Sequence, residues 1–419
     1  MSQPQGLPNL GQSCYLNTVL QALASLEPFT TYLNRLVVAL YSDSSGAATN
    51  AKRDGFPRQL SRCLTRLRVR DVHMESAVYP LSLKEDVRGL RSRLNTHRGK
   101  RAGHNRQDDA DDAFHAIMEL LEDIAEGAFR GLKSVLRTGS SEEYSSVCST
   151  PLPFEGLETN DMMCLTCQRN RPLRVHPFLS LRLRLVYTPG GGGLNGLLQE
   201  KYRPDPRGVS GVNCFPCTVV DARDSYQAAL ESGCEPDADV EEVLRGASVA
   251  GATPPVATEE DVDDWPAFVD KVYEQDGVDL EEVLSGRLAR IPTAKRDIYR
   301  QDRIVQLPTL LCIHLDRASE GHGKRNEHVE IPFELAPSEV AGGKYVPFAS
   351  RYALKAVAVH IGRDSASGHY VSFCLLNGAW YFFNDDAEPV MVSPGDVARQ
   401  SAYMLFYEMH TSPPTPTPT

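Results

Sequence analysis

Two blocks at opposite ends of the chain most constrain its fold. Residues 6–23 carry Cys14 directly before a helical pattern, and residues 368–386 carry His369, followed by Asn384 and Asp385. A thiol is a poor nucleophile until it becomes a thiolate. A helix N-terminus and a nearby imidazole lower the thiol pKa, and a third polar group holds the imidazole in place. A fold that uses these groups together must bring both ends of a 419-residue chain to one place.

The hydrophobic pattern changes from a helical period to a period of two near Pro151, which predicts an α+β fold. Helices are expected over Cys14–Leu40, Phe56–Asn95 and Asp108–Ala128. The carboxyl half is expected to form a mostly antiparallel sheet, with strands at Phe178–Leu185, Ile304–Leu315, Tyr352–His360, Tyr370–Leu376, Trp380–Asn384 and Tyr403–Tyr407. The Pro- and Thr-rich residues 411–419 are expected to be a disordered tail.

The net charge of −11 is unevenly distributed along the chain. Residues 221–290 hold 19 acidic and 5 basic side chains and have the character of an insertion. Residues 52–106 hold 15 basic and 5 acidic side chains. A zinc-containing nucleic-acid binder could use such a basic stretch. Its basic residues are mixed with Leu and Val at helical spacing, which favours a solvated helix face. The stretch also lacks interleaved aromatic residues, so no nucleic-acid partner is expected.

Four of the ten cysteines form two Cys-x-x-Cys pairs, Cys164 with Cys167 and Cys214 with Cys217. Four thiolates in a tetrahedral array make a structural zinc site that is closed to substrate. The intervening residues suit two hairpin tips that meet at one metal ion. The alternative is that these are reduced cysteines in turns. No secretory signal or membrane span is evident, which argues against a disulfide framework.

The block around Cys14 resembles the cysteine box of the ubiquitin-specific proteases, a family of deubiquitinating enzymes. The matching positions are Gly6, Leu7, Asn9, Gly11, Ser13, Cys14, Tyr15, Asn17, Leu20 and Gln21. By this resemblance Cys14 is the nucleophile, and Asn9 donates a hydrogen bond to the tetrahedral oxyanion. Backbone amides at the start of a helix can supply further donors.

The block around His369 resembles the histidine box of the same family. Its matching segments are His360–Gly362, Ser367–Tyr370, Ser372–Phe373 and Trp380–Asp385. His369 is then the general base for Cys14 and later the acid for the leaving amine. Asn384 falls on the third catalytic position, which is Asp or Asn in the family. Asp385 is the alternative orienting group.

The resemblance implies a papain-like fold of thumb, palm and fingers, with a zinc ribbon in the fingers. One catalytic domain over residues 1–410 would divide into a thumb at 1–150, fingers at 151–310 with the acidic insertion, and a palm at 311–410. It also implies hydrolysis of the bond after the terminal glycine of ubiquitin, through a thioester on Cys14. The zinc would be structural, the partners ubiquitin and ubiquitinated proteins, and the protein a monomer. A catalytically weak ubiquitin-binding module of the same fold is the alternative.

Residues 107–122 depart from the family pattern. Asp108, Asp111, Asp112 and Ala113 stand where the family usually has Gln, His, Glu and Phe, so substrate contacts do not transfer from those positions.

Several other segments are similar to the family member anchored in the mitochondrial outer membrane. That member has a serine where this chain has Asn384. A cytoplasmic location is expected, or the mitochondrial outer membrane if an upstream anchor or partner exists.

Overall fold

The structure, a computed structural model, describes residues 4–41, 51–68, 88–92, 94, 109–135, 152–168, 170–185, 193–203, 208–235, 237–238, 292–319, 323–336, 350–362 and 368–410. The chain divides into two compact units. Unit 1 comprises Met1–Glu158, His176–Arg203 and Ile304–Thr419, and unit 2 comprises Thr159–Val175 and Pro204–Arg303. The proposed tail and most of the acidic insertion and of the basic stretch lie outside the described residues.

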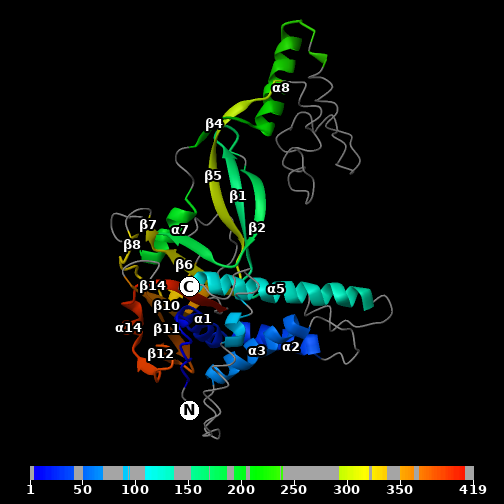
Figure 1. The fold of residues 1–419 in the computed structure, drawn as a ribbon. Coiled ribbons are helices and arrows are strands. Elements are labelled where there is room, and N and C mark those ends of the chain that lie inside the picture. Colours follow the sequence, from blue (N-terminus) through cyan, green and yellow to red (C-terminus); the bar gives the residue numbers. More distant parts are fainter. Residues whose placement is uncertain are drawn as a thin grey trace, which may run out of the picture. The chain divides into compact units, whose positions relative to one another are not determined.

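An eight-stranded sheet forms the framework of unit 1 (Figure 1). Its order is β13-β12-β11-β10-β14-β6-β3, with β9 paired to β10. The described strand pairs are antiparallel except β3 with β6, which confirms the expected mostly antiparallel sheet. A short β7–β8 pair stands beside it. The strands are β3 (Leu181–Arg184), β6 (Leu310–Asp316), β7 (Ala318–Ser319), β8 (Gly323–Lys324), β9 (Glu334–Leu335), β10 (Arg351–Ile361), β11 (His369–Leu376), β12 (Ala379–Phe383), β13 (Val390–Val392) and β14 (Ala402–His410).

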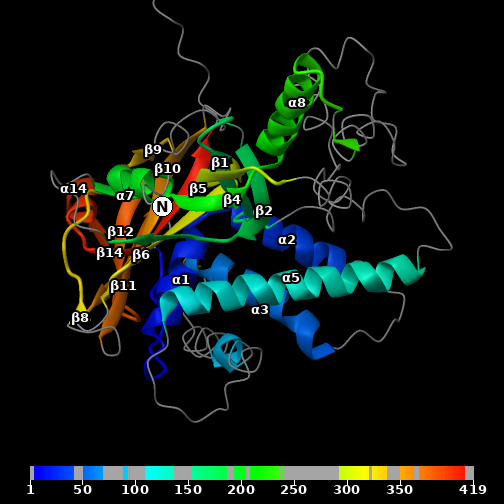
Figure 2. The same cartoon turned by 90° about the horizontal axis from the view of Figure 1, so that it is seen from above.

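Helix α1 is the central helix of unit 1 (Figure 2). All twelve of its residues are buried, because β10 and β11 contact it on one side and three further helices contact it on others. The unit 1 helices are α1 (Cys14–Ser25), α2 (Glu27–Tyr41), α3 (Ala51–Arg68), α5 (Ala110–Val135), α7 (Gly193–Lys201) and α14 (Pro394–Ala398). Most side chains of α1 are apolar or small, and the amide groups of its buried Asn17 and Gln21 donate hydrogen bonds to Leu7, Asp385 and Gln5.

The prediction of a single helix over Cys14–Leu40 is wrong, because the helix is interrupted at Leu26. This residue is extended, with φ −97° and ψ 106°, and its N–H bonds to the Leu23 carbonyl. Pro28 explains the break. Proline has no N–H and clashes within a helix interior, but it is well accommodated in a first turn, where it lies in α2.

The single strand expected over Ile304–Leu315 is also interrupted. Strand β5 ends at Gln306 and β6 begins at Leu310. Pro308 lies between them and cannot donate to a strand ladder. Likewise the expected Phe178–Leu185 strand is two strands, because β2 ends at Phe178 and β3 begins at Leu181.

Both faces of the sheet are buried at its central strands β10, β11 and β14, and alternate residues of these strands enter different cores. In β14, Met404 and Phe406 join the core that includes α1 and α5, whereas Leu405 and Tyr407 join the core on the opposite face with α7. Successive side chains of a strand point to opposite faces, so a doubly covered strand reads as a continuous apolar run. Of these strands, β10 and β11 contact α1 directly.

Unit 2 is built around a four-stranded sheet of order β2-β1-β5-β4. Its strands are β1 (Gly156–Cys164), β2 (Asn170–Phe178), β4 (Val209–Asn213) and β5 (Lys295–Gln306), and α8 (Phe215–Glu231) follows β4. Helix α8 runs past residue 221, so the expected boundary of the acidic insertion falls inside a helix. Half-buried Arg296 pairs with Asp221 of this helix at 2.8 Å.

Replacement of Phe154 by Ala should strongly destabilise unit 1. Phe154 is fully buried, and its ring centroid lies 4.9 Å from that of Phe114 and 5.9 Å from that of Phe29. Such a cavity costs about 3–5 kcal/mol of unfolding free energy. Chemical denaturation should show this loss, whereas Val390→Ala at an exposed edge position should change the value by less than about 0.5 kcal/mol. A loss at Phe154 as small as that at Val390 would contradict the described core.

Candidate active site and cysteine cluster

Cys14 is the first residue of α1, as the sequence predicts. The turn before it has positive φ at Gly11 (76°) and Gln12 (56°), which reverses the chain directly into the helix. Ser13 stabilises this turn, since its Oγ accepts from the backbone N–H of Leu10 at 2.8 Å. The thiol therefore lies at the amide-rich start of a helix, where negative charge is favoured.

Asp385 connects the segment before Cys14 to the turn that carries Asn384. Its two carboxylate oxygens accept from Asn9 Nδ2 at 2.8 Å and Asn17 Nδ2 at 2.7 Å. Its backbone carbonyl accepts from Leu7 N–H at 2.7 Å. A Cβ on Gly6 would lie 2.4 Å from that carbonyl oxygen, so only glycine permits this approach. These contacts join the two distant sequence blocks, as their chemistry requires.

His369 begins β11 and contacts Asn384. The His369 Nε2 atom lies 2.7 Å from Asn384 Oδ1, whereas Asp385 Oδ2 lies 3.8 Å from the same nitrogen. A carbonyl oxygen only accepts hydrogen bonds, so the imidazole proton resides on Nε2 and the Nδ1 lone pair is left available. The geometry therefore favours Asn384 as the group that orients the imidazole.

The backbone of the histidine block reaches the thiol. A hydrogen bond from the backbone of Tyr370, the residue after His369, lowers the pKa of Cys14. Burial has the larger effect, however, and raises the pKa of Cys14 above its usual value of 9.0, with a further increase from the Asp385 carboxylate. Only 2% of Cys14 is exposed. The expected lowered thiol pKa is therefore not found in this state of the protein.

Asn9 lies in the predicted place, but its amide has partners of its own. Its Nδ2 donates to Asp385, and its Oδ1 accepts from the Ser13 backbone N–H at 3.3 Å. One Nδ2 hydrogen is left for an oxyanion, so the predicted donor role stays a prediction. The sequence analysis assigned no role to Asn17, whose side-chain amide donates to Asp385. Its position about one helical turn after Cys14, on the same side of the helix, could have indicated a place in the site.

The four cysteines of the two Cys-x-x-Cys pairs come together in unit 2. Their sulfur atoms lie within 4.8 Å of one another, with Cys164 to Cys217 at 3.8 Å and Cys167 to Cys214 at 3.7 Å. Tetrahedral ligands at a zinc–sulfur distance of about 2.3 Å are about 3.8 Å apart. The cluster thus fits a tetrahedral metal ion bound by four sulfur atoms.

The second cysteine pair is not at a hairpin tip, contrary to the prediction. Cys164 and Cys167 lie at the turn between β1 and β2. Cys214 instead directly follows β4 and is the residue before α8, and Cys217 lies in the first turn of α8. Proline in the first turn of α8 suits a helix start, which explains why this pair leads into a helix.

Comparison with known proteins identifies the family. The sequence profile described as ubiquitin carboxyl-terminal hydrolase matches residues 5–407. The chain belongs to this family. Ubiquitin carboxyl-terminal hydrolase 3 of Homo sapiens is 23% identical, covering 97% of this chain and 68% of that one. Ubiquitin carboxyl-terminal hydrolase 27 of Arabidopsis thaliana is 24% identical, covering 96% of this chain and 85% of that one.

A solved structure shares the fold. The SAGA Ubp8/Sgf11/Sus1/Sgf73 DUB module bound to ubiquitin aldehyde contains a chain that matches with a TM-score of 0.60 and 17% identity, over 97% of this chain and 70% of that one. The papain-like fold expected for a ubiquitin-specific protease is confirmed. This ubiquitin carboxyl-terminal hydrolase is thus a thiol-dependent deubiquitinating peptidase.

Among the described residues, no helix of the hydrolase has both the length and the apolar character needed to cross a bilayer.

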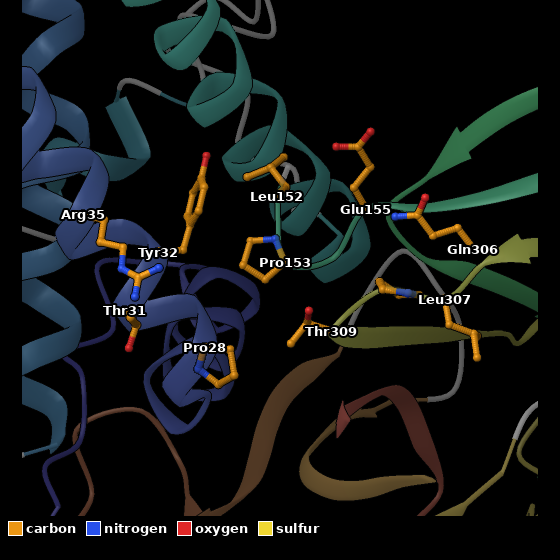
Figure 3. Close-up of a pocket in the computed structure, with 11 residues that line it drawn as sticks. Pro28, Thr31, Tyr32, Arg35, Leu152, Pro153, Glu155, Gln306, Leu307 and Thr309 are labelled. Carbon is orange, nitrogen blue, oxygen red and sulfur yellow. The ribbon is translucent and has the colours of Figure 1, made fainter. Parts of the chain in front are cut away.

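A cavity of about 280 Å³ lies between α2 and the segments 152–155 and 306–309 (Figure 3). Tyr32, Leu152 and Pro153 stand around it, and none of the proposed catalytic or cysteine-cluster residues lines it.

Alkylation of Cys14 should keep accelerating above pH 9. The thiolate is the reactive form, and a raised pKa means that its fraction still increases with pH in that range. Asp385→Asn removes a negative charge that raises this pKa, so its profile should move to lower pH. Peptide-resolved mass spectrometry after iodoacetamide treatment measures the rate, with Glu388→Gln as a charge-matched control. A wild-type plateau below pH 8 would contradict the buried, neutral thiol.

Proposed function

We propose that this hydrolase cleaves the isopeptide or peptide bond after the terminal glycine of ubiquitin through a thioester on Cys14. The hydrogen bond between His369 Nε2 and Asn384 Oδ1 is the observation that supports this most directly, because it leaves His369 Nδ1 as the base. The backbone contact between Tyr370 and the thiol supports the proximity of the two blocks. Family membership supplies ubiquitin as the substrate.

In the proposed reaction, His369 takes the Cys14 proton and the thiolate attacks the carbonyl carbon of the terminal glycine. The protonated imidazole then returns a proton to the leaving amine, and a thioester on Cys14 results. Water attacks the thioester with His369 again as the base, which releases the ubiquitin carboxylate and restores the thiol. Asn384 keeps the ring in one tautomer throughout.

The transient oxyanion would be stabilised at the start of α1. Backbone N–H groups there point out of the helix, and the second Nδ2 hydrogen of Asn9 can add a donor. Asp385 fixes the Asn9 side chain at 2.8 Å, so this donor would be oriented before substrate arrives. An oriented donor costs no reorganisation during the reaction.

A catalytically weak ubiquitin-binding module is the second candidate. The burial of Cys14 and its raised pKa favour this alternative, because both reduce the thiolate population at neutral pH. The complete set of Cys14, His369 and Asn384 favours the enzyme. Substrate that draws Cys14 into contact with charged and polar groups would offset the burial.

We also propose that the four-cysteine cluster binds a structural zinc ion. Cys164, Cys167, Cys214 and Cys217 would hold it, and bound zinc would supply a fixed cross-link with no position open to substrate. With zinc bound, the cluster would fasten the β1–β2 turn to the start of α8. Backbone hydrogen bonds support both sides, since Leu165 N–H donates to Asp297 and Cys214 N–H donates to Ala294.

The proposed catalytic groups come from one chain, which supports a monomer as the active form. The cytoplasmic location expected from the sequence stays a prediction.

An electrophilic ubiquitin probe tests the proposed function. Wild-type protein should form a covalent adduct at Cys14 and cleave diubiquitin, because attack by Cys14 is the covalent step. Cys14→Ala should retain ubiquitin binding and lose both reactions. Cys63→Ala, at another buried thiol, is the matched control and should keep them. Ubiquitin binding without adduct formation by the wild type would instead support the binding module, and turnover by Cys14→Ala would refute the thioester route.

Asn384→Ala and Asp385→Ala should have different effects. Asn384 is exposed and contacts the imidazole, so its loss should lower kcat about 100-fold, within the usual range for general-base catalysis, with little effect on stability. Asp385→Ala removes two hydrogen bonds and should cost about 2–3 kcal/mol of unfolding free energy as well as activity. Steady-state kinetics and denaturation on both variants measure this. A larger kcat loss in a fully stable Asp385→Ala protein would assign the orienting role to Asp385.

Cys217→Ser should lower the zinc content of purified protein and the melting temperature of unit 2. Serine replaces a thiolate ligand at a site where four are needed. Elemental analysis together with thermal unfolding measures both effects, and exposed Cys234→Ser is the control. Unchanged stability after complete chelation of the metal would contradict a structural role.

A further inference from the structure

The proposed reaction leaves the basic stretch at residues 52–106 without a role. Much of this stretch lies outside the described residues, but residues 88–92 are described and helical. Leu90 is buried in the same core as Cys14, and a Cβ on Gly89 would lie 2.3 Å from the Gln59 side chain of α3. This helical segment therefore packs closely against the helices of unit 1.

One arginine of this segment, Arg91, reaches the turn before Cys14. Its Nη1 donates to the backbone carbonyl of Gly11 at 2.8 Å and to that of Leu10 at 3.3 Å. The Arg91 side chain is partly buried, and it joins positions that lie 80 and 81 residues apart in the sequence. The expected solvated helix face is thus interrupted here, because this guanidinium contacts the backbone beside the proposed nucleophile.

This turn has a conformation that needs support from its surroundings. Gly11 and Gln12 both have positive φ, at 76° and 56°, and a residue other than glycine adopts this region only at a cost in free energy. Within the block, Ser13 Oγ helps to hold the turn by accepting from Leu10 N–H at 2.8 Å. Arg91 adds a contact from a separate helical segment, and hydrogen bonds from a charged donor are about twice as strong as neutral ones.

The contact with Arg91 sets the orientation of two peptide groups. In a trans peptide the carbonyl and the N–H lie in one plane and point in opposite directions. A carbonyl that is held by the guanidinium therefore also directs the N–H of the following residue, so the N–H groups of Gly11 and Gln12 point away from Arg91. These peptide groups come directly before Ser13 and Cys14, so their orientation determines how the chain enters α1 and presents the thiol.

We propose that Arg91 is a positioning residue for the cleavage reaction, because it holds the turn before Cys14 in the conformation from which the thiol and the oxyanion donors act. The proposal rests on the cleavage function proposed above. Arg91 does not need to touch substrate, since it acts through the carbonyls of Leu10 and Gly11. Displacement of a reacting group by about 1 Å can cost about 100-fold in rate, so loss of this contact should be visible in kcat.

A contact that only fastens residues 88–92 to the cysteine block is the alternative. Loss of such a contact would lower the melting temperature and leave kcat of the folded protein unchanged. Loss of a contact that positions the turn would lower kcat in protein that is still folded, and another cation at position 91 would restore it. Lysine can donate to both carbonyls, because its ammonium group has three N–H donors.

Steady-state hydrolysis of a fluorogenic ubiquitin substrate by the full chain tests the proposal. Arg91→Met keeps the apolar part of the side chain and removes the donors, so it should lower kcat about tenfold and leave KM within about twofold of wild type. This loss is smaller than the roughly 100-fold cost of removing an oxyanion donor, because the donors are misaligned and not removed. Arg91→Lys should restore most of kcat. Arg88→Met is the matched control, since Arg88 is exposed in the same helical segment, and it should keep the wild-type kcat.

Amide hydrogen exchange on peptides that cover residues 7–16 provides a readout that does not need catalysis. Exchange there should be faster in Arg91→Met than in wild type, whereas Arg91→Lys and Arg88→Met should match wild type. Thermal unfolding checks that each variant is folded, and Arg91→Gln, whose amide is too short to reach both carbonyls, replaces Arg91→Met if that protein unfolds.

The two readouts separate failure of this proposal from failure of the proposed function. An inactive wild-type protein would refute the cleavage function, and the exchange result alone would then decide whether Arg91 holds the turn. In an active protein, an unchanged kcat in folded Arg91→Met would overturn the proposal. A loss of kcat that Arg91→Lys does not restore, or unchanged exchange over residues 7–16, would overturn it as well.

Discussion

The Asp385 carboxylate is the contact on which the arrangement of the site depends. Two blocks more than 350 residues apart meet there, because one side chain accepts from Asn9 and from Asn17 while its own carbonyl accepts from Leu7. A carboxylate buried to this extent needs such donors to offset its lost hydration. The contact aligns three things at once: the turn before Cys14, the first turn of α1 and the turn that carries Asn384. The backbone at Asp385 has φ 47°, and the fold maintains this uncommon conformation.

The rigidity behind that contact comes from the sheet. Strands β10, β11 and β14 are covered on both faces, and α1 lies against β10 and β11 with every residue buried. Dense packing of this kind allows little relative displacement of neighbouring elements. His369 begins β11 and Cys14 begins α1, so both proposed catalytic groups are attached to the ends of densely packed elements. The backbone of Tyr370, next to His369, forms a hydrogen bond with Cys14, and Asp385 joins the segments that precede them.

Much of the architecture could be predicted from the sequence, and so could the residues that the structure brings together. The family resemblance of the two end blocks pointed to Cys14 and His369, and the two Cys-x-x-Cys pairs pointed to a four-sulfur cluster, while the catalytic and zinc-binding roles stay predictions. The helix break at Leu26 and the strand break at Pro308 were missed, since the apolar pattern continues across both and only the prolines mark them. The helical context of the Cys214 pair was missed because a Cys-x-x-Cys pair has the same spacing at a hairpin and at a helix start. Burial of the Cys14 thiol was not predictable either. It results from contacts among α1, β11 and the N-terminal segment, which no local pattern records.

That burial bears on the chemical reactivity of the Cys14 thiol. A neutral, 2% exposed thiol is protected from oxidants and alkylating agents, which attack the thiolate. The same Asp385 that aligns the site also raises the pKa of Cys14 by its charge, so alignment and protection come from one carboxylate.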